Sequence, residues 1–501
     1  MKRKFLKFLF SATLMLSSLL YVGCTNLEEK VFDTISTDTF FRTEPEFLAA
    51  LVPVYANLRS IAWAYYNINQ HTSDETMVPQ RGGDWGDNGK WRQLHQHTWD
   101  KSHPDINDAW NNAYDGVARV NYMIPQFEKA PETIKSKKRF IAELKFLRAF
   151  HYYMLIDFFG GVPIVTVPRL DFSNLPARNT RQEVFDFIIK ETTESINDLP
   201  ATVPDVEYGR VTKGTANALL AKMYLNAGVW TGTPQWQKAV DACNAVINSG
   251  NYKLSPKYFD NFVVSNQKSP ENIFVAPSLA QDGLGLTMNM RTLHYNQHPQ
   301  SPWNGFCTIA EYYNSFDKSD ERFKIFLSGQ AFDVLTGAPV NNRQGAPLIF
   351  TLDVPMIGAN ENNGIRVLKW AVDPAQLGGH AGNDYAIFRY ADILLIKAEA
   401  LNELNGPTAE SVGLVNSVRA RVFSPEKPIS PSNKDGFRTA ILAERGFELG
   451  WEGIRRQDLI RHGKFQNAWS NKAVSEGFRN LFAIPQFQID TNPKLAQNPG
   501  Y

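Results

Sequence analysis

The sequence predicts a mainly α-helical protein: a tetratricopeptide-like scaffold of helical hairpins that carries a large, irregular, loop-rich insertion. Apolar residues recur at helical spacing over about 40–250 and again over about 384–465. Between these regions, residues from about 255 to 380 are rich in Gly, Asn, Pro and aromatic residues and show little periodicity. Long insertions of this kind tend to carry binding function. The 501 residues, 43% of them hydrophobic, can bury a large core, and we expect one domain over 24–501.

Capping signals mark where the helices of the scaffold begin and end. In a capping box, a Thr side chain and a Glu three residues later each satisfy a free backbone N–H in the first helical turn. Thr43-Glu44-Pro45-Glu46 and Thr180-Arg181-Gln182-Glu183 have this pattern, and Gly160-Gly161 is a typical stop. The tail over 480–501 is expected to be extended. The expected helices span about 44–59, 106–127, 137–159, 181–197, 212–228, 234–250, 387–404, 408–421 and 435–450.

Two pairs of neighbouring helices show the alternation of small and large residues that is typical of tetratricopeptide hairpins. The first pair is 217–224 with 236–247, and the second is 393–404 with 409–418. Ordinary packing of antiparallel helices accounts for the same residues equally well. Under either interpretation the helices form a scaffold from which the insertion extends.

The N-terminus has the features of a secretory signal peptide over residues 1–23. Met1-Lys2-Arg3-Lys4 is basic, Phe5 to Val22 is mostly apolar, and Gly23-Cys24 follows. Tyr21-Val22-Gly23-Cys24 resembles the lipobox of bacterial lipoproteins, which predicts lipid attachment at Cys24 and a firm membrane anchor. The alternative is an ordinary cleaved signal followed by a chance Cys. Apart from this lipid we expect no cofactor, and no later stretch is expected to span a membrane.

Composition and motifs exclude several classes of function. Lys and Arg number 52 against 51 Asp and Glu, and no basic cluster follows the N-terminus, which excludes a nucleic-acid partner. The sequence has no phosphate loop, dinucleotide fingerprint or nucleophile elbow, so it lacks the motifs of the enzyme classes that depend on them. His95, His97 and His103 have neither a His-Glu-x-x-His pattern nor a Cys partner, and a hydrogen-bonded role is expected in place of a metal site. Paired carboxylates of a glycoside hydrolase stay an alternative.

Aromatic residues mixed with polar ones favour carbohydrate binding. Sugar rings present flat apolar faces edged by hydroxyls, so their sites combine exposed aromatic rings with hydrogen-bonding side chains. Five of the 11 Trp fall between residues 63 and 110, and the stretches 72–99 and 291–306 both have the required mixture. Packing of the same rings into the core is the alternative, about as well supported for Trp85 and favoured for Trp110. The candidate carbohydrate-binding residues are Asp74, Arg81, Trp85, Trp91, Tyr295 and Trp303.

Five segments in order along the chain resemble the SusD/RagB family of Bacteroidetes outer-membrane nutrient-binding lipoproteins. Their charged residues stand within apolar helices, where we expect them to form ion pairs between packed helices. Gly446 stands where the family often has Arg. The segments are Ala142–Tyr153 leading into Phe159-Gly160-Gly161-Val162-Pro163, Gly209–Ala216, Phe388–Ala400 with Val415–Arg421, Glu444–Leu449 with Trp451–Arg461, and Gln497–Tyr501.

The resemblance implies a fold, a location and a function. It implies a tetratricopeptide-like scaffold held by lipid on the cell outer membrane and facing the cell exterior. There the protein would capture a polysaccharide or oligosaccharide for nutrient uptake and deliver it to a SusC-type TonB-dependent transporter, without catalysis. A surface glycoside hydrolase, or a tetratricopeptide-type scaffold for protein partners, stays as an alternative function.

Overall fold

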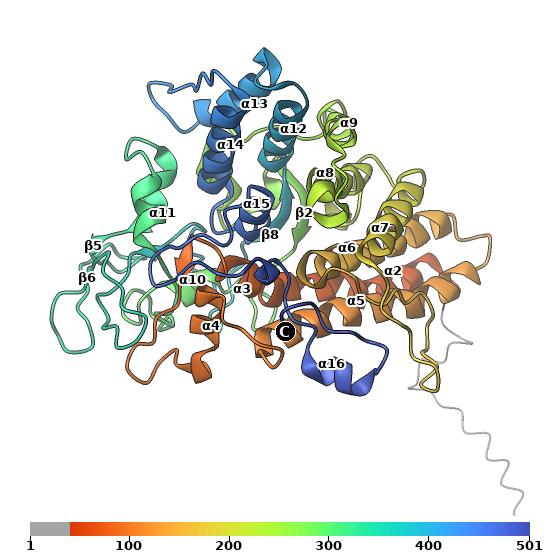
Figure 1. Ribbon diagram of the computed structural model, residues 1–501, viewed down its shortest axis with the longest axis horizontal. Coiled ribbons are helices and arrows are strands. Elements are labelled where there is room, and N and C mark those ends of the chain that lie inside the picture. Colours follow the sequence, from red (N-terminus) through yellow and green to blue (C-terminus); the bar gives the residue numbers. More distant parts are fainter. Residues whose placement is uncertain (1–40) are drawn as a thin grey trace, which may run out of the picture.

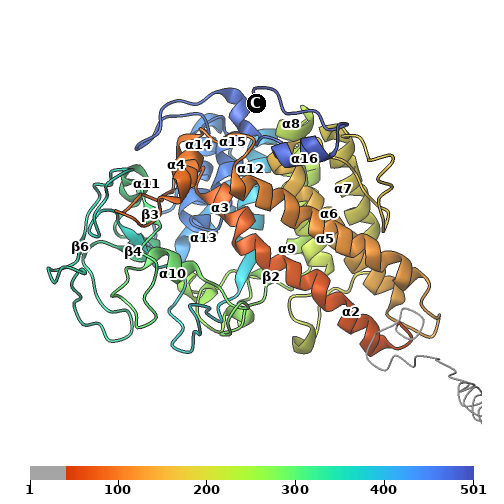
Figure 2. The same ribbon diagram turned by 90° about the horizontal axis from the view of Figure 1, so that it is seen from below.

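The structure is a computed structural model that describes residues 41–501, so the predicted signal peptide and Cys24 lie outside the described residues. Helices fill one side of the molecule and the loop-rich insertion fills the other, as both views show (Figure 1, Figure 2). This arrangement confirms the predicted fold class, a helical scaffold with a large irregular insertion.

The first half of the chain builds most of the scaffold. From α5 onward each helix packs against the next one along the chain, up to α9. Helix α6 is buried on nearly all sides, which explains its continuous apolar and aromatic sequence. The helices are α2 (Glu44–Ala56), the 3-10 helix η2 (Asn57–Ala62), α3 (Ala64–Gln70), α4 (Lys90–Gln96), α5 (Pro104–Glu128), α6 (Lys137–Phe159), α7 (Arg181–Ile196), α8 (Lys213–Thr231) and α9 (Trp236–Ile247).

The scaffold resumes after the insertion. Helix α12 packs on α8 and α9 as well as on α13 and α14, so the two helical regions form one continuous layer of hairpins. The expected hairpin pairs are therefore present as α8 with α9 and α12 with α13. The later helices are α12 (Tyr390–Asn405), α13 (Ala409–Ala420), α14 (Lys434–Leu449), α15 (Arg455–Arg461) and α16 (Gln486–Thr491).

The insertion consists of short elements, and four two-stranded antiparallel sheets in the described residues lie within it or join it to the rest of the chain. Sheet β2–β8 joins the two ends of the insertion and fixes it to the scaffold. The short helices are α10 (Met288–Thr292) and α11 (Ala310–Ser315). The sheets pair β1 (Thr76–Met77) with β3 (Cys307–Thr308), β2 (Asn272–Ala276) with β8 (Tyr385–Arg389), β4 (Phe326–Leu327) with β7 (Arg366–Val367), and β5 (Gly329–Gln330) with β6 (Ile349–Phe350).

The predicted capping signals are present in the structure. The predicted and observed helices differ mainly in the residues at which they end. Capping boxes are present at Thr43 and Thr180. Helix α2 ends earlier than expected and continues as η2, and α8 runs past Gly228 to a left-handed Gly232 at its end. The run Glu44–Gln70 is apolar and long enough to cross a membrane, which the sequence analysis overlooked, but part of it packs into the core.

The C-terminal tail is less extended than predicted. It contains the short helix α16, and its last residues are bonded to the core. The Asn498 side-chain amide donates to the carbonyls of Phe159 and Phe482, at 3.1 and 2.7 Å. Trp99 donates its indole N–H to the Tyr501 hydroxyl at 2.6 Å, so the end of the chain closes over the scaffold.

Charged residues in the motif helices form buried ion pairs, as expected. Glu143 accepts from Arg210 at 2.7 Å, and Arg148 pairs with Glu191 at 2.7 Å. Arg389 contacts three carboxylates, those of Glu271, Glu448 and Glu452, at 2.6–3.1 Å. These residues hold the helices and the base of the insertion together, and they are closed off from ligands.

Candidate functional site

Sheet β1–β3 brings the two aromatic stretches of the sequence together. Thr76 pairs with Thr308 and Met77 with Cys307, although each pair is separated by about half the chain. The Thr308 hydroxyl also donates to the Glu75 carbonyl at 2.8 Å. The loops that follow β1 and precede β3 therefore lie side by side and form one surface.

Three tryptophans and a tyrosine, Trp63, Trp85, Trp303 and Tyr295, form what we call the aromatic surface. Trp63 is 41% exposed, and its ring meets the Trp303 ring edge to face, with centroids 6.5 Å apart. The Trp85 indole N–H donates to the Trp303 carbonyl at 2.7 Å, so the two loops are tied to each other. Trp85, Trp303 and Tyr295 are half-buried, which leaves part of each ring open to a ligand.

Trp85 rests on a layer of buried aromatic rings. Its ring centroid lies 5.7 Å from that of Trp91 and 5.5 Å from that of Phe306. Trp91 is only 4% exposed and donates its N–H to Asp87 at 2.6 Å, so it supports the surface and cannot stack on a sugar. The prediction of Trp91 as a carbohydrate contact is corrected accordingly. Residue 305 must be Gly, because a Cβ there would lie 2.3 Å from the Trp85 ring.

The loops that carry these rings hold strained backbone. Trp85 has φ 59°, and Ser301 and Asn304, on either side of Trp303, have φ 49° and 53°. A left-handed conformation costs a bulky residue such as Trp on the order of 1–3 kcal/mol and persists only where the surroundings enforce it. Such outliers gather at ligand sites, so their presence at both tryptophan loops points to a binding surface.

Polar groups surround Tyr295. Its hydroxyl donates to the Asp84 carboxylate at 2.5 Å, and the Arg343 guanidinium lies 4.4 Å above its ring. Arg343 also pairs with Glu361 at 2.6 Å and is half exposed. Burial and the Asp84 carboxylate raise the pKa of Tyr295 to about 12, so it stays a hydrogen-bond donor at physiological pH. The arrangement supplies an exposed carboxylate and an exposed guanidinium beside the rings.

Two of the predicted contacts have structural roles. Arg81 is 3% exposed and donates to the backbone carbonyls of Asn304 and Asn360, at 2.9 and 2.5 Å. Asp74 is paired with Arg455 at 2.8 Å, which ties the loop after α3 to α15. Arg81 is therefore closed off from a ligand. The prediction for Arg81 is corrected accordingly. Asp74 is half-buried and pairs with the scaffold, so its role as a sugar contact stays a prediction.

Trp63, Arg291 and Arg343 were not among the contact residues predicted from the sequence. Trp63 was counted in the tryptophan cluster but was not distinguished from its neighbours. Arg291 is buried, donates to the Ala62 carbonyl at 2.8 Å, and places its guanidinium 4.3 Å from the Trp63 ring centre. Burial lowers its pKa to about 10, so it stays charged at neutral pH. Only the local polar–aromatic mixture around residue 291 could have indicated it.

The three histidines are hydrogen-bonded, as predicted. The rings of His95 and His97 lie within 2.7–3.1 Å of the Ser470 carbonyl, the Thr72 carbonyl and other oxygens, and the His103 ring lies 3.1 Å from the Lys90 carbonyl. Burial lowers the pKa of His97 to about 2. Within residues 41–501 no group of three or more His, Cys, Asp or Glu side chains is placed to hold a metal ion.

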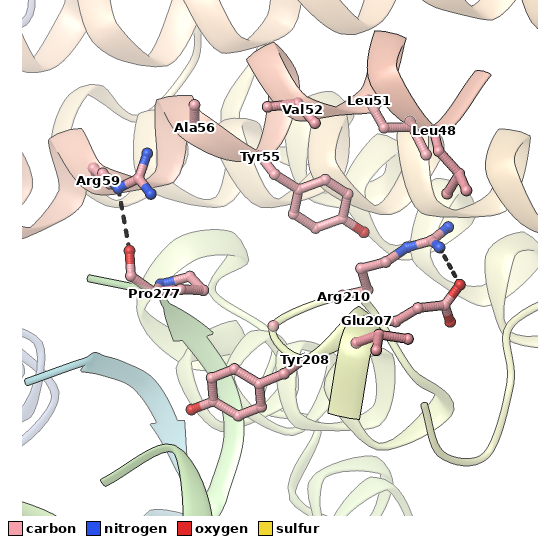
Figure 3. A pocket seen from close by; sticks show the side chains of 12 residues that line it. Leu48, Leu51, Val52, Tyr55, Ala56, Arg59, Glu207, Tyr208, Arg210 and Pro277 are labelled. Atoms are coloured by element: carbon pink, nitrogen blue, oxygen red, sulfur yellow. Dashed lines mark hydrogen bonds and ion pairs between the residues drawn. The ribbon is translucent and has the colours of Figure 1, made fainter. Parts of the chain in front are cut away.

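A second hollow of about 450 Å³ runs along α2 and differs in chemistry (Figure 3). Tyr55 on α2 and Arg59 on η2 point toward the facing wall, where Arg59 donates to the Pro277 carbonyl at 3.1 Å. The lining of this hollow is mostly apolar, with Leu48, Val52 and Val206 among the exposed side chains. It shares no residue with the aromatic surface and lacks that surface's combination of exposed indoles and polar groups.

Comparison with known proteins gives consistent matches along the chain. A family profile described as the SusD family matches residues 246–501, and one described as "Starch-binding associating with outer membrane" matches residues 38–225. The SusD-like protein P2 of Formosa agariphila is 25% identical over an alignment that covers 98% of this chain and 99% of that protein. The starch-binding protein SusD of Bacteroides thetaiotaomicron is also 25% identical, and the alignment covers 87% and 85%.

Solved structures show the same relationship in three dimensions. A laminarin-binding SusD-like protein superimposes with a TM-score of 0.76 at 25% identity, covering 92% of this chain and all of that one. The family resemblance inferred from the sequence motifs is therefore confirmed.

Proposed function

Because the chain belongs to the SusD family, we propose that it is a cell-surface lipoprotein that captures a polysaccharide or oligosaccharide on the aromatic surface. It then delivers the glycan to a SusC-type TonB-dependent transporter. The observation that carries the proposal is the pair of strained loops that present Trp85 and Trp303 beside the exposed Trp63. Relatives described as binding starch or laminarin support the same ligand class.

The geometry explains how such a surface holds a sugar. Indole rings offer flat apolar faces on which the C–H faces of a sugar ring can pack, while hydroxyls at the ring edge need hydrogen-bond partners. Asp84, Arg343 and the Tyr295 hydroxyl lie beside the rings and supply acceptors and donors. Because the supporting rings are packed and the loops are tied together, little conformational freedom is lost on binding.

The state of the nearby carboxylates supports binding without catalysis. Asp84 accepts from Tyr295, and Glu361 accepts from Arg343 and lies 2.8 Å from His294. Although burial opposes it, the hydrogen bonds from Arg343 and His294 lower the pKa of Glu361. An ionised, paired carboxylate is a poor general acid, whereas glycoside hydrolysis needs one that holds a proton. We therefore propose a binding protein, not a hydrolase.

The anchor belongs to the same proposal. Cys24 carries the lipid in the outer membrane, on the face exposed to the exterior, after removal of residues 1–23. Two or more acyl chains would hold the protein firmly, since one chain alone gives only marginal binding. The profile match to proteins associating with the outer membrane supports this location. Metabolic labelling with a palmitate analogue should mark the wild type but not Cys24→Ser.

Glycan binding is tested with the soluble form that begins at Thr25. Its affinity for a panel of plant, microbial and algal polysaccharides is measured by calorimetry and affinity electrophoresis, and product release is followed by chromatography. Trp85→Ala and Trp303→Ala should each weaken binding roughly tenfold, since each removes a stacking ring. Phe487→Ala is the matched control, because Phe487 is 70% exposed and lies on α16, outside the aromatic surface.

Either result is informative. Binding without product release, weakened by both tryptophan substitutions and unchanged in the control, would support glycan capture at this surface. No binding by the wild type across the panel would overturn the proposal.

A further inference from the structure

Buried arginines divide into two groups in the described part of the chain. Five are paired with carboxylates within 4 Å, and three have no carboxylate at that distance among residues 41–501. The paired ones are Arg148, Arg322, Arg389, Arg445 and Arg456, and the others are Arg81, Arg291 and Arg366. All three of the second group contact the loops that carry the aromatic surface.

Arg291 lies directly behind Trp63. Its guanidinium is 4.3 Å from the Trp63 ring centre and 5.7 Å from that of Tyr66, and its hydrogen bonds go to the Ala62 carbonyl and the Thr287 hydroxyl. None of these partners carries a charge. The positive charge of Arg291 is therefore balanced only by dipoles and by ring faces.

Arg81 and Arg366 hold the loop behind Trp303. Arg81 donates to the Asn304 carbonyl at 2.9 Å, and Arg366 donates to the Asn304 side-chain oxygen at 2.6 Å and to the Glu361 carbonyl at 3.0 Å. One terminal nitrogen of Arg81 and the side-chain nitrogen of Asn304 are buried without an acceptor among the described residues. Burial and the neighbouring Arg81 lower the pKa of Arg366, as expected for a cation without a counter-charge.

Charges at the rim offset only one of these three cations. Arg343 faces two carboxylates, Asp84 and Glu361, which leaves one negative charge there. Asp87 lies at the edge of the surface and accepts from Trp91, while Arg92 lies beside it against Gly89. Five arginines thus meet three carboxylates around the aromatic surface, which leaves an excess of positive charge behind the rings.

We propose that the glycan captured by the aromatic surface is anionic, carrying carboxylate or sulfate groups. This inference rests on the proposed glycan-binding function and adds the substrate class. Fixed positive charges behind a surface with low-dielectric walls attract anions, and water in the site screens them less than it screens exposed lysines. Exposed Arg343 supplies the planar, bidentate donor that suits a carboxylate or a sulfate at the rim.

A purely structural role for the three arginines predicts something different. Carbonyl bonding alone does not mark a ligand site, because the partly buried Arg178 and Arg181 also bond carbonyls in the scaffold. If Arg81, Arg291 and Arg366 only clamp loops, neutral and anionic glycans of the same backbone should bind alike. If they set the local potential, the anionic form should bind more tightly, and the difference should shrink as salt is added.

The experiment compares matched polysaccharides with the soluble form from Thr25. One pair is polygalacturonate and its fully methyl-esterified form, and the other is sulfated and native laminarin, so that carboxylate and sulfate are separated. Alginate, chondroitin sulfate, starch, xylan and mannan complete the set. We expect the tightest ligand to be anionic, with affinity roughly tenfold or more above its neutral match in about 20 mM salt and less in about 300 mM salt.

Variants of Arg291 separate charge from packing. Arg291→Met should reduce the preference for the anionic member roughly three- to tenfold, whereas Arg291→Lys should keep most of it. Arg119→Gln, on α5, is the control for net charge. Unfolding curves of each variant show that it folds, and the salt series on the wild type needs no variant.

Three outcomes separate the two proposals. A salt-sensitive preference for anionic glycans supports the inference. A neutral polysaccharide as the tightest ligand, or no difference within pairs, overturns it and leaves glycan capture standing. No binding to any polysaccharide overturns both.

Discussion

The scaffold and the aromatic surface treat buried arginines in opposite ways. In the scaffold, Arg389 meets three carboxylates and Arg322 meets Asp320, Glu444 and Glu448. Although burial opposes it, these carboxylates raise the pKa of both arginines. Behind the aromatic surface, burial lowers the pKa of Arg291 and Arg366, which bond mainly to carbonyls.

This difference determines which buried charges contribute to the electrostatic potential at the protein surface. A buried pair cancels its own field, so the scaffold network fixes the register of helices and leaves little potential at the surface. An arginine held by carbonyl dipoles keeps its net charge, and that charge acts on whatever approaches the rings. Among the described residues, the arginines that are most buried and lack a carboxylate partner contact the binding loops, where backbone with positive φ is also found.

The largest expected effect comes from breaking the scaffold network. Arg389→Met leaves the buried carboxylates of Glu271, Glu448 and Glu452 without their shared partner. We expect the free energy of unfolding to fall by about 3–5 kcal/mol, because an abandoned buried carboxylate is strongly destabilising. Urea denaturation measures the change. A loss below about 1 kcal/mol would show that Arg421 and Lys369 compensate, and the contrast between the two regions would fail.

Glu75 is the converse of the arginines that lack a carboxylate partner: in the part of the chain that the structure describes, it is a buried carboxylate that lacks an arginine partner. Glu75 accepts from the Gln70 side chain and the Trp451 N–H, at 2.7 and 2.9 Å, and has no ion pair within 4 Å among the described residues. Burial raises its pKa to about 7. The folded state therefore keeps a proton up to about pH 7 that the unfolded chain releases near pH 4.3, and the contribution to stability falls as pH rises between these values.

Glu75→Gln tests this linkage. The amide imitates the protonated acid and accepts the same two hydrogen bonds through its oxygen. At pH 8 the variant should be more stable than the wild type by about 3 kcal/mol, and near pH 4 the two should be nearly equal. Unfolding curves at both pH values measure the difference. Equal stability at pH 8 would mean that Glu75 is not protonated in the folded protein at neutral pH.

Local patterns predicted more of the fold than of the site. Helix α6 and the capping boxes at Thr43 and Thr180 follow from residues within a few positions of each other, so the sequence could indicate them. Trp85 and Trp91 stand six residues apart in the same aromatic stretch, yet one lies at the surface and the other beneath it. Both rings pack on Phe306, which is brought to them by the β1–β3 pairing from about half the chain away, so no local pattern could tell which ring would be covered.

Electrostatic partners were the least predictable feature for the same reason. Arg343 lies over Tyr295 and pairs with Glu361, and Arg81 bonds to Asn304 across more than two hundred residues. Nothing in the neighbourhood of an arginine in sequence says whether a carboxylate or a carbonyl will meet it. The composition of the loops could therefore indicate the aromatic surface, but the polar partners of its residues could be known only from the tertiary structure.

Removing an arginine from the aromatic surface should cost less than removing one from the scaffold. Arg291→Met gives up hydrogen bonds to Ala62 and Thr287 and the stacking on Trp63, but it abandons no carboxylate. We expect a loss of about 1–2 kcal/mol, clearly below that of Arg389→Met under the same conditions. Equal losses in the two variants would show that the carboxylates are not what separates the two regions.

An exposed ion pair should show the smallest loss of stability among the three variants that are compared. Lys324 and Glu321 lie 3.2 Å apart, but their side chains are 69% and 34% exposed. Water and salt screen such a pair, and holding two flexible side chains in place offsets most of the attraction, so Lys324→Ala should change stability by less than about 0.5 kcal/mol. Urea denaturation of Arg389→Met, Arg291→Met and Lys324→Ala under the same conditions would rank the three variants by their loss of stability. A large fall in the free energy of unfolding of Lys324→Ala would mean that ion pairing by itself stabilises this protein. A negligible fall would mean that an ion pair stabilises the fold only where it is buried. The three arginines behind the aromatic surface that lack a carboxylate partner among the described residues would then stabilise the fold less than the buried, paired ones do.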